Sequence, residues 1–289
     1  MQAVGQAVGQ AVGLRQAVNS GSAASPPDGL IVPPLAALAP QRRLAVRIAV
    51  GPRDIEAAQQ LRWQVFYEEG GAIADGNSGI DVDRYDAVCD HLLVEDLGHG
   101  SGEPVVVGTY RLLRETVARR HGGFYSACEY DLAPLAALNG ELLELGRSCV
   151  AAPYRDSRTI QLLWRGIADY LNRHDIGMMF GCASLPGIDP AVHAETLGYL
   201  WRHHLAPPQL RVRALPERFV PMNLGSETVD RAAMLQALPP LIKGYLRVGA
   251  MLGDGAVIDH QFNTVDVFVM MPVEGIARRY RDRFQAVGG

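Results

Sequence analysis

Alternation of apolar and polar residues, together with short β-branched runs, marks the strands of this chain. The segment "LAVRIAV" (44–50) alternates from its first residue, and "PVVVGTYRLLR" (104–114) is rich in valine. A glycine-rich turn at 97–103 joins the latter to the preceding run, which predicts an antiparallel pair. The predicted strands are 44–50, 91–96, 104–114, 141–150, 177–185 and 265–271.

Apolar residues at helical spacing lie between these strands. Asp54 is a plausible N-cap and Gly70 a plausible stop for the first helix. The predicted helices are 54–70, 159–175, 190–204, a segment around 234–250, and 273–284.

The order of these elements predicts an α+β fold, in which a central sheet is flanked by helices. A doubly wound nucleotide-binding fold is disfavoured, because no GxGxxG follows the first strand and no GxxxxGK[ST] occurs in the sequence.

The first 42 residues differ from the rest of the chain. They begin with the repeat "QAVGQAVGQAVG", continue with Ser-, Ala- and Pro-rich sequence, and contain no acidic residue before Asp28. This composition predicts a disordered, low-complexity extension at 1–42 and one folded domain at 43–289.

Composition narrows the function. The net charge is −4 and the pI about 6.1, which disfavours a duplex-DNA binder. No apolar run approaches the length of a membrane span, and the start lacks the pattern of a secretory signal. The four cysteines form no CxxC pair, so we expect reduced thiols, no metal site and a cytoplasmic location.

One predicted strand carries two charges near its end. Glu144 and Arg147 are three residues apart in "ELLELGRSCV", so a regular strand would point them to opposite faces unless a bulge forms near Gly146. Glu144 is a candidate proton acceptor for an amine. The alternative is an ion pair with Arg111 or Arg147 at the strand end.

Carboxylates also gather in the loop "IDVDRYDAVCD". Asp83 and Asp86 are suited to holding a cationic amine, and the alternative is a solvated turn. Arg62 and Arg111 are suited to binding a substrate carboxylate or to ordering this loop, although Arg62 is equally compatible with a helix surface.

A series of segments carries a specific resemblance. In order, they include "LRWQVFYEE", "DRYDAVCDHLLVED", "VVGTYRLLR", "FYSACEYDL", "LLELGRSCV", "YRDSRTIQLLWRGI", "GCASLPGIDP" and "LIKGYLRVGAMLGDGAVID". Over residues 44–285 the chain resembles the N-acyltransferases of bacterial ornithine-lipid synthesis, GNAT-fold relatives of the acyl-homoserine-lactone synthases. The resemblance implies a GNAT-like domain with a mostly antiparallel central sheet.

The resemblance also implies an activity and a set of residues. A 3-hydroxyacyl group passes from acyl carrier protein to the α-amine of L-ornithine and gives a lyso-ornithine lipid. Ornithine carries two ammonium groups, which suits an acidic pocket. The implied catalytic residues are Glu144, Arg147 and Asp86. The implied substrate-binding residues are Arg62, Phe66, Asp83 and Arg111.

In a GNAT fold, the helix that follows the splayed strand binds the donor's phosphate at its N-terminus. The resemblance therefore assigns Arg155, Ser157 and Arg158 to the donor phosphate or carrier. Arg158 and Ile160 replace the small residues of a coenzyme A loop, which favours the single phosphopantetheine phosphate of a carrier protein, and no other cofactor is expected. Arg165 and Arg173 either extend a docking patch for the acidic carrier or form a solvated face.

Other functions stay open. The same fold can acylate glycine, glutamine or a homoserine derivative, and a non-catalytic module can bind acyl carrier protein or lipid. The segment "LPPLIKGYLRVG" can rest on a membrane surface, which would make the protein peripheral at the inner membrane. A pore-forming role has neither an amphipathic pore segment nor a series of transmembrane strands to support it.

Deleting residues 1–42 should leave acyl-transfer turnover unchanged, because the predicted domain begins after them. Comparing kcat of the full and shortened chains tests this. A large loss of turnover in the shortened chain would show the extension to be part of the working enzyme.

Overall fold

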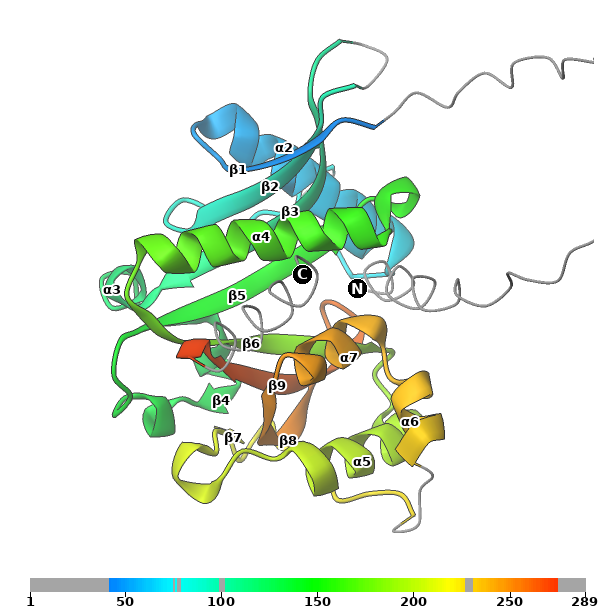
Figure 1. The fold of residues 1–289 in the computed structure, drawn as a ribbon. Helices are drawn as coiled ribbons and strands as arrows, with labels where there is room; N and C mark the ends of the chain where they lie inside the picture. The colour runs from blue at the N-terminus through cyan, green and yellow to red at the C-terminus, as the bar shows by residue number, and fades with distance from the viewer. Residues whose placement is uncertain (1–41, 75, 77–78, 99–101, 227–230, 275–289) are drawn as a thin grey trace, which may run out of the picture.

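A computed structural model describes residues 42–74, 76, 79–98, 102–226 and 231–274, so the extension predicted at 1–42 lies outside it except for Arg42. The described chain builds a nine-stranded sheet in the order β1-β2-β3-β5-β6-β9-β8-β7-β4, with helices on both faces (Figure 1). All neighbouring strands are antiparallel except β5–β6 and β7–β8. The predicted α+β fold with a mostly antiparallel sheet is confirmed.

The strands vary from two residues to eleven. Their bounds are β1 Leu44–Ile48, β2 Asp90–Asp96, β3 Val105–Arg114, β4 Tyr130–Asp131, β5 Glu141–Val150, β6 Ile176–Pro186, β7 Arg213–Ala214, β8 Met251–Asp259 and β9 Thr264–Pro272. The sequence did not predict β8 as a strand, because Gly253, Asp254 and Gly255 interrupt its apolar pattern.

The helices cover the sheet in two layers. Their bounds are α2 Pro52–Trp63, α3 Glu115–Ala118, α4 Ser157–Arg173, α5 Ala194–His204, α6 Arg231–Ala237 and α7 Pro240–Arg247. The long helix α4 packs across β1, β2 and β3. Helix α2 packs on β3 and β5 from the opposite face. Two adjacent residues of β5 show this: the side chain of Cys149 packs in the apolar cluster of α2, whereas that of Val150 packs in the cluster of α4.

Two predicted helices are altered. The first becomes π-helical over Gln64–Glu69 (η1), directly after α2. The segment around 234–250 is divided into α6 and α7 at Pro239-Pro240. Proline has no backbone N–H and clashes with the preceding helical turn, so it ends α6 but is tolerated in the first turn of α7. The predicted helix at 273–284 falls beyond the described residues from position 275 onward.

The parallel pair β5–β6 opens after a short ladder. Its register runs from Glu141–Ile176 to Glu144–Phe180, and beyond it β5 pairs only with β3. Gly181 lies at the point of divergence, where a Cβ would stand 2.2 Å from the carbonyl oxygen of Leu145. The two strands therefore approach most closely at a glycine and then separate, which leaves a gap in the middle of the sheet.

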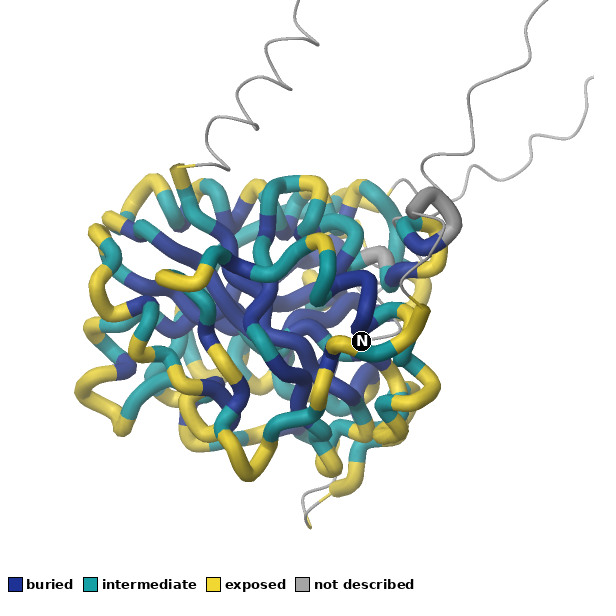
Figure 2. The backbone as a smooth tube through the Cα atoms, turned by 90° about the horizontal axis from the view of Figure 1, so that it is seen from below, coloured by how far each residue is buried: buried dark blue, intermediate teal, exposed yellow. Residues whose placement is uncertain are grey.

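Buried residues concentrate in the central strands, and exposed ones lie mainly in the connections around them (Figure 2). No helix among the described residues is both long and apolar enough to cross a bilayer.

Replacing Gly181 by alanine should lower the unfolding free energy by about 1–3 kcal/mol, because the new methyl group would overpack the start of the gap. Urea unfolding of both proteins measures this. Gly244→Ala is the matched control, since a Cβ there meets nothing within 4 Å and alanine favours the helix. Equal stability of Gly181→Ala and the wild type would show that β5 and β6 are not in close contact.

Candidate active site

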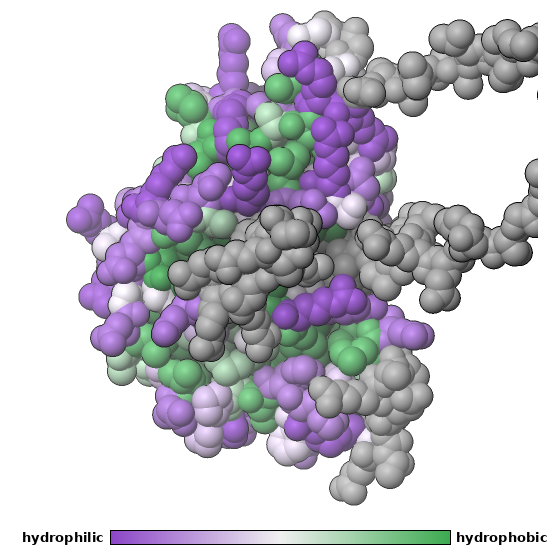
Figure 3. All heavy atoms as spheres, in the orientation of Figure 1, coloured by the Kyte–Doolittle hydropathy of each residue, from purple (hydrophilic) through white to green (hydrophobic). Residues whose placement is uncertain are grey.

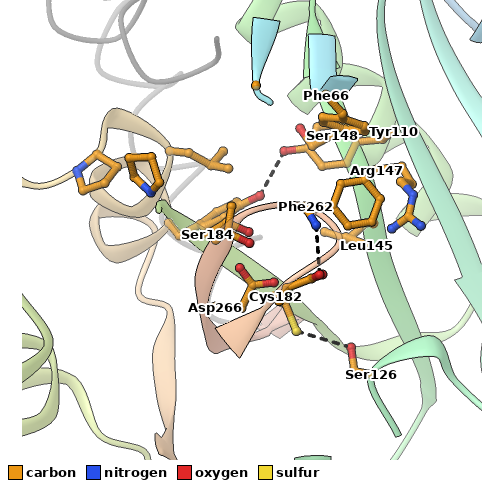
Figure 4. A pocket seen from close by; sticks show the side chains of 18 of the residues that line it. Phe66, Tyr110, Ser126, Leu145, Arg147, Ser148, Cys182, Ser184, Phe262 and Asp266 are labelled. Carbon is orange, nitrogen blue, oxygen red and sulfur yellow. Dashed lines mark hydrogen bonds between the residues drawn. The ribbon is translucent and has the colours of Figure 1, made fainter. Parts of the chain in front are cut away.

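A cavity of about 960 Å³ occupies the gap between β5 and β6 (Figure 4). This volume is at the upper end of the range of about 300–1,000 Å³ that is common for small-molecule sites. The lining comes from η1, β3, the turn at Tyr125–Cys128, β5, β6, the end of β8, the β8–β9 turn, β9 and the α6–α7 segment.

Strand alternation divides this lining into two sides. One side of the cavity lies on the face of the sheet that α2 covers, and its lining is polar. This polar side includes Arg111, Tyr125, Ser126, Glu144, Arg147, Cys182, Ser184 and Asp266. Residues from the face of α4 and α7 give a largely apolar side, which includes Tyr110, Leu145, Leu238, Leu241 and Tyr245, with Ser148, Gln236 and Lys243 among its polar members. The cavity thus crosses the sheet and offers a different chemistry on each face.

A β-bulge near Gly146, the condition for Glu144 and Arg147 to share a face, is present. The β3–β5 register shifts between Thr109 and Arg111, so that β5 contributes one extra residue, and Arg147 takes a left-handed φ of 50°. Such a φ is uncommon outside glycine and clusters at functional sites. The bulge changes the parity of the strand, and Glu144 and Arg147 therefore line the same cavity.

Beside the polar side lies a ring of alternating charges. Each guanidinium contacts two carboxylates and each carboxylate contacts two guanidiniums, in the order Arg62, Asp86, Arg111, Asp83, Arg147 and Asp81. The N–O separations run from 2.6 Å for Arg111–Asp83 to 3.2 Å for Arg147–Asp81. Arg62 Nε lies 2.8 Å from Asp81 Oδ2, but the pair does not have the geometry of a hydrogen bond. The hydrogen bonds of Arg62 are donated by Nη1 and Nη2.

The ring determines what its members can do. Burial by itself raises the pKa of Asp86, but the hydrogen bonds and charge of Arg62, with the charge of Arg111, outweigh it and hold the pKa well below its usual range. Asp86 is therefore an ionised, fully engaged carboxylate. Of the predicted residues, Phe66, Arg111, Glu144 and Arg147 line the cavity, whereas Arg62, Asp83 and Asp86 support it from behind.

Glu144 is held by the turn at Tyr125–Cys128. Its Oε1 accepts from the Ser126 amide at 2.7 Å and from the Ser126 hydroxyl at 2.5 Å, and its Oε2 accepts from the Tyr125 amide at 2.7 Å. Burial raises the pKa of Glu144, although these hydrogen bonds oppose the shift. The predicted alternative, a direct ion pair with Arg111 or Arg147, is absent from the ion pairs of the described residues.

The residues predicted to bind the donor phosphate surround the start of α4 and do not line the cavity. Arg155 donates from Nε to the Val150 carbonyl at 3.0 Å and pairs with Glu69. Asp156 caps the helix by accepting from the Thr159 amide at 3.0 Å, so one N–H of this terminus is already occupied. Ser157 is half-buried and Arg158 exposed, and their role in binding the donor stays a prediction.

Sequence reasoning missed several residues. Asp81 belongs to the ring, and the spacing of Asp81, Asp83 and Asp86 in one loop was a signal for it. No local signal unites Glu129, Cys182 and Asp266, which come from three distant segments. Their ligand atoms lie within 4.8 Å of one another, and within the described ranges they form the one group of this kind that could hold a metal ion.

Solved structures of similar shape include a CoA-dependent acyl-homoserine lactone synthase, MesI (13% identity, TM-score 0.41, covering 83% of this chain and 94% of that one). Another is FeeM, an N-acyl amino acid synthase from uncultured soil microbes (13% identity, TM-score 0.40, covering 81% and 92%).

Residues 61–165 match the acetyltransferase (GNAT) domain, which with the fold and the divided cavity defines a GNAT-type acyltransferase. A protein of Brucella abortus is 49% identical over 244 residues, covering 82% of this chain and 87% of its own length. One of Rhizobium meliloti is 45% identical over 253 residues, covering 85% and 86%. Both are named L-ornithine N(alpha)-acyltransferase, and the chain belongs to this family.

Replacing Asp86 by asparagine should lower the unfolding free energy at pH 7 by about 3–5 kcal/mol, because it leaves buried guanidinium charge uncompensated. The folded-state pKa of Asp86 is lowered, so its contribution exists above the unfolded pKa of about 3.9 and is lost as the pH falls further. The difference between variant and wild type should therefore shrink below about pH 4 in urea unfolding.

Asp254→Asn is the control for this measurement. Asp254 lies 3.7 Å from Arg213, whose side chain is 64% exposed, so its loss should cost less than about 1 kcal/mol. Equal effects of the two substitutions would contradict a special contribution of the ring.

Proposed function

We propose that this protein transfers a 3-hydroxyacyl group from acyl carrier protein to the α-amine of L-ornithine and so produces lyso-ornithine lipid, the first step of ornithine-lipid synthesis. The name of the relatives supports the acceptor. The observation that carries the proposal is the cavity itself, because its charged side suits an amino acid and its apolar side suits a fatty chain.

The acceptor binds on the polar side. Arg111 and Arg147 line it with guanidinium groups held in place by the ring, which suits them to the substrate carboxylate. The rings of Phe262 and Tyr125 lie 4.5 and 5.0 Å from the guanidinium carbon of Arg147 and restrict it further. Asp86 contacts Arg62 and Arg111, and also Gln59, His91 and the Asp83 amide, but it does not line the cavity. Its contribution to the reaction is therefore to position Arg111.

The chemistry needs the amine to lose a proton before it attacks. Glu144 takes this proton, since burial raises its pKa and Oε2 has a single hydrogen-bond donor in the Tyr125 amide. The amine nitrogen then bonds to the thioester carbon, the carbon–sulfur bond breaks, and the departing thiolate receives the second proton of the amine. Direct attack requires no serine or cysteine nucleophile.

The donor approaches from the apolar side. Leu238, Leu241 and Tyr245 offer a wall for the acyl chain, and the phosphopantetheine enters as part of the carrier rather than as a resident cofactor. Arg158, Arg165 and Arg173 are exposed on the outer face of α4, where polar side chains dominate the surface (Figure 3). We propose that they dock the acidic carrier, with Arg155 and Ser157 near the phosphate. A peripheral contact of α7 with the membrane would depend on Leu241 and Leu246, which are partly buried and pack against the core.

Purified protein with 3-hydroxyacyl carrier protein and L-ornithine should give lyso-ornithine lipid, read by mass spectrometry beside glycine, glutamine and a homoserine derivative as acceptors and acyl-CoA as donor. Glu144→Gln should lower kcat by about 10²–10⁴-fold, because the proton acceptor is lost.

Glu141→Gln on the same strand is the matched control, since Glu141 contacts Thr116 and Arg114 and does not line the cavity. Product with another amine alone would keep the fold and reject ornithine. No product with any pair would favour the non-catalytic binding module.

A further inference from the structure

Ornithine carries a second ammonium group, and the aspartates of the ring are poorly placed to bind it. Each of Asp81, Asp83 and Asp86 is already shared between two guanidiniums, so the ring as a whole is electrically neutral. Glu144 in turn is assigned to the α-amine, and it already accepts three hydrogen bonds from the turn at Tyr125–Cys128. A further cation in the cavity therefore needs a different partner.

Asp266 on β9 is that partner by geometry. Its side chain lines the polar side of the cavity, it is only 7% exposed, and its Oδ1 has no hydrogen-bond partner among the residues that the structure describes. Figure 4 shows it on the far side of the pocket from Arg147, next to Cys182 and Ser184. A buried carboxylate oxygen without a donor is costly, and a cation bound in the cavity would remove that cost.

A second carboxylate strengthens the negative field at this place. Glu129 lies behind Cys182, with its Oε2 3.8 Å from Cys182 Sγ. Within the described part of the chain, its one ion pair is with the partly exposed Arg218 at 3.2 Å. Burial raises the pKa of Asp266 to about 6, against the opposing effect of the Ser184 and Thr264 hydroxyls, and it raises the pKa of Glu129 to about 7, against that of Arg218. Repulsion by neighbouring acids adds to both shifts, as expected of buried carboxylates with too little compensating positive charge.

We propose that Asp266, supported by Glu129, binds the side-chain ammonium of the acceptor amino acid and makes the enzyme selective for a basic amino acid. This inference rests on the proposed function. The arginines on β3 and β5 then bind the α-carboxylate at one end of the cavity, and Asp266 binds the second nitrogen at the other. The α-amine is left near Glu144, where it can lose its proton.

A metal ion is the alternative occupant of this cluster. Glu129, Cys182 and Asp266 offer three ligand atoms within 4.8 Å of one another, the lower limit of the three or four protein side chains of a zinc site. In the metal-free protein, burial and the two carboxylates raise the pKa of Cys182 well above its usual value, so a bound ion would have to displace the thiol proton.

The test compares L-ornithine with L-norvaline, which has the same carbon chain without the second nitrogen. In the wild type, kcat/KM should favour ornithine strongly. Asp266→Asn should lower kcat/KM for ornithine by about 10–150-fold, mainly through KM, because a hydrogen bond to a charged group is lost. Turnover of norvaline should stay unchanged or rise, which a general loss of structure would not produce.

Asp254→Asn is the matched control, because Asp254 contacts Trp201 and Arg213 and lies outside the cavity lining. Its preference for ornithine should equal that of the wild type. Thermal unfolding checks that each variant folds. If Asp266→Asn does not fold, Glu129→Gln, which does not line the cavity, should still weaken the preference for ornithine.

Each result decides between the two proposals. A wild type that acylates ornithine and norvaline equally, or an Asp266→Asn variant that keeps the wild-type preference, overturns the ammonium site and leaves the proposed function standing. A wild type that acylates neither amino acid overturns both. Stoichiometric metal in the purified protein, measured by mass spectrometry, would assign the cluster to an ion instead.

Discussion

A closed ring of three arginines and three aspartates holds this molecule's site together. It joins α2, the loop at 81–86, β3 and the bulge of β5, which are far apart in the sequence. Replacing one member of a buried ion pair leaves an unmatched charge, so the six groups stabilise one another only as a complete set. Two of the arginines also reach the cavity, and their orientation there depends on carboxylates that never touch it.

The ring works together with two irregularities of the sheet. The divergence of β5 from β6 after Glu144 creates the space, and the bulge at Arg147 turns a guanidinium into it. A regular strand would send Glu144 and Arg147 to opposite faces. The left-handed backbone at Arg147 is thus held by ion pairs to Asp81 and Asp83, so local strain and long-range charge pairing depend on each other.

Most of the fold could be predicted from the sequence, because strands such as β3 and β5 and the amphipathic helix α4 show clear hydrophobic periodicity. Strand β8 could not be predicted, since its glycines interrupt the alternation of apolar and polar residues. The π-helical segment after α2 could not be predicted either. For the site, the resemblance led to the residues, but whether each faces the cavity or supports it depends on tertiary pairing. Asp266 and Glu129 had no signal at all, because only the packed sheet brings them together.

The division of the cavity by strand alternation has a consequence for how such enzymes diversify. In the proposed binding mode, the amino acid and the acyl chain contact side chains on opposite faces of the sheet. The side chains for the amino acid come from the strands, and those for the acyl chain come largely from the α6–α7 segment. Substitutions in α6 and α7 can therefore alter the length of the lipid tail while the head group is kept. A lineage that adapts its membranes to a new temperature or habitat can therefore change the acyl tail of the lipid without changing the site for its amino-acid head group.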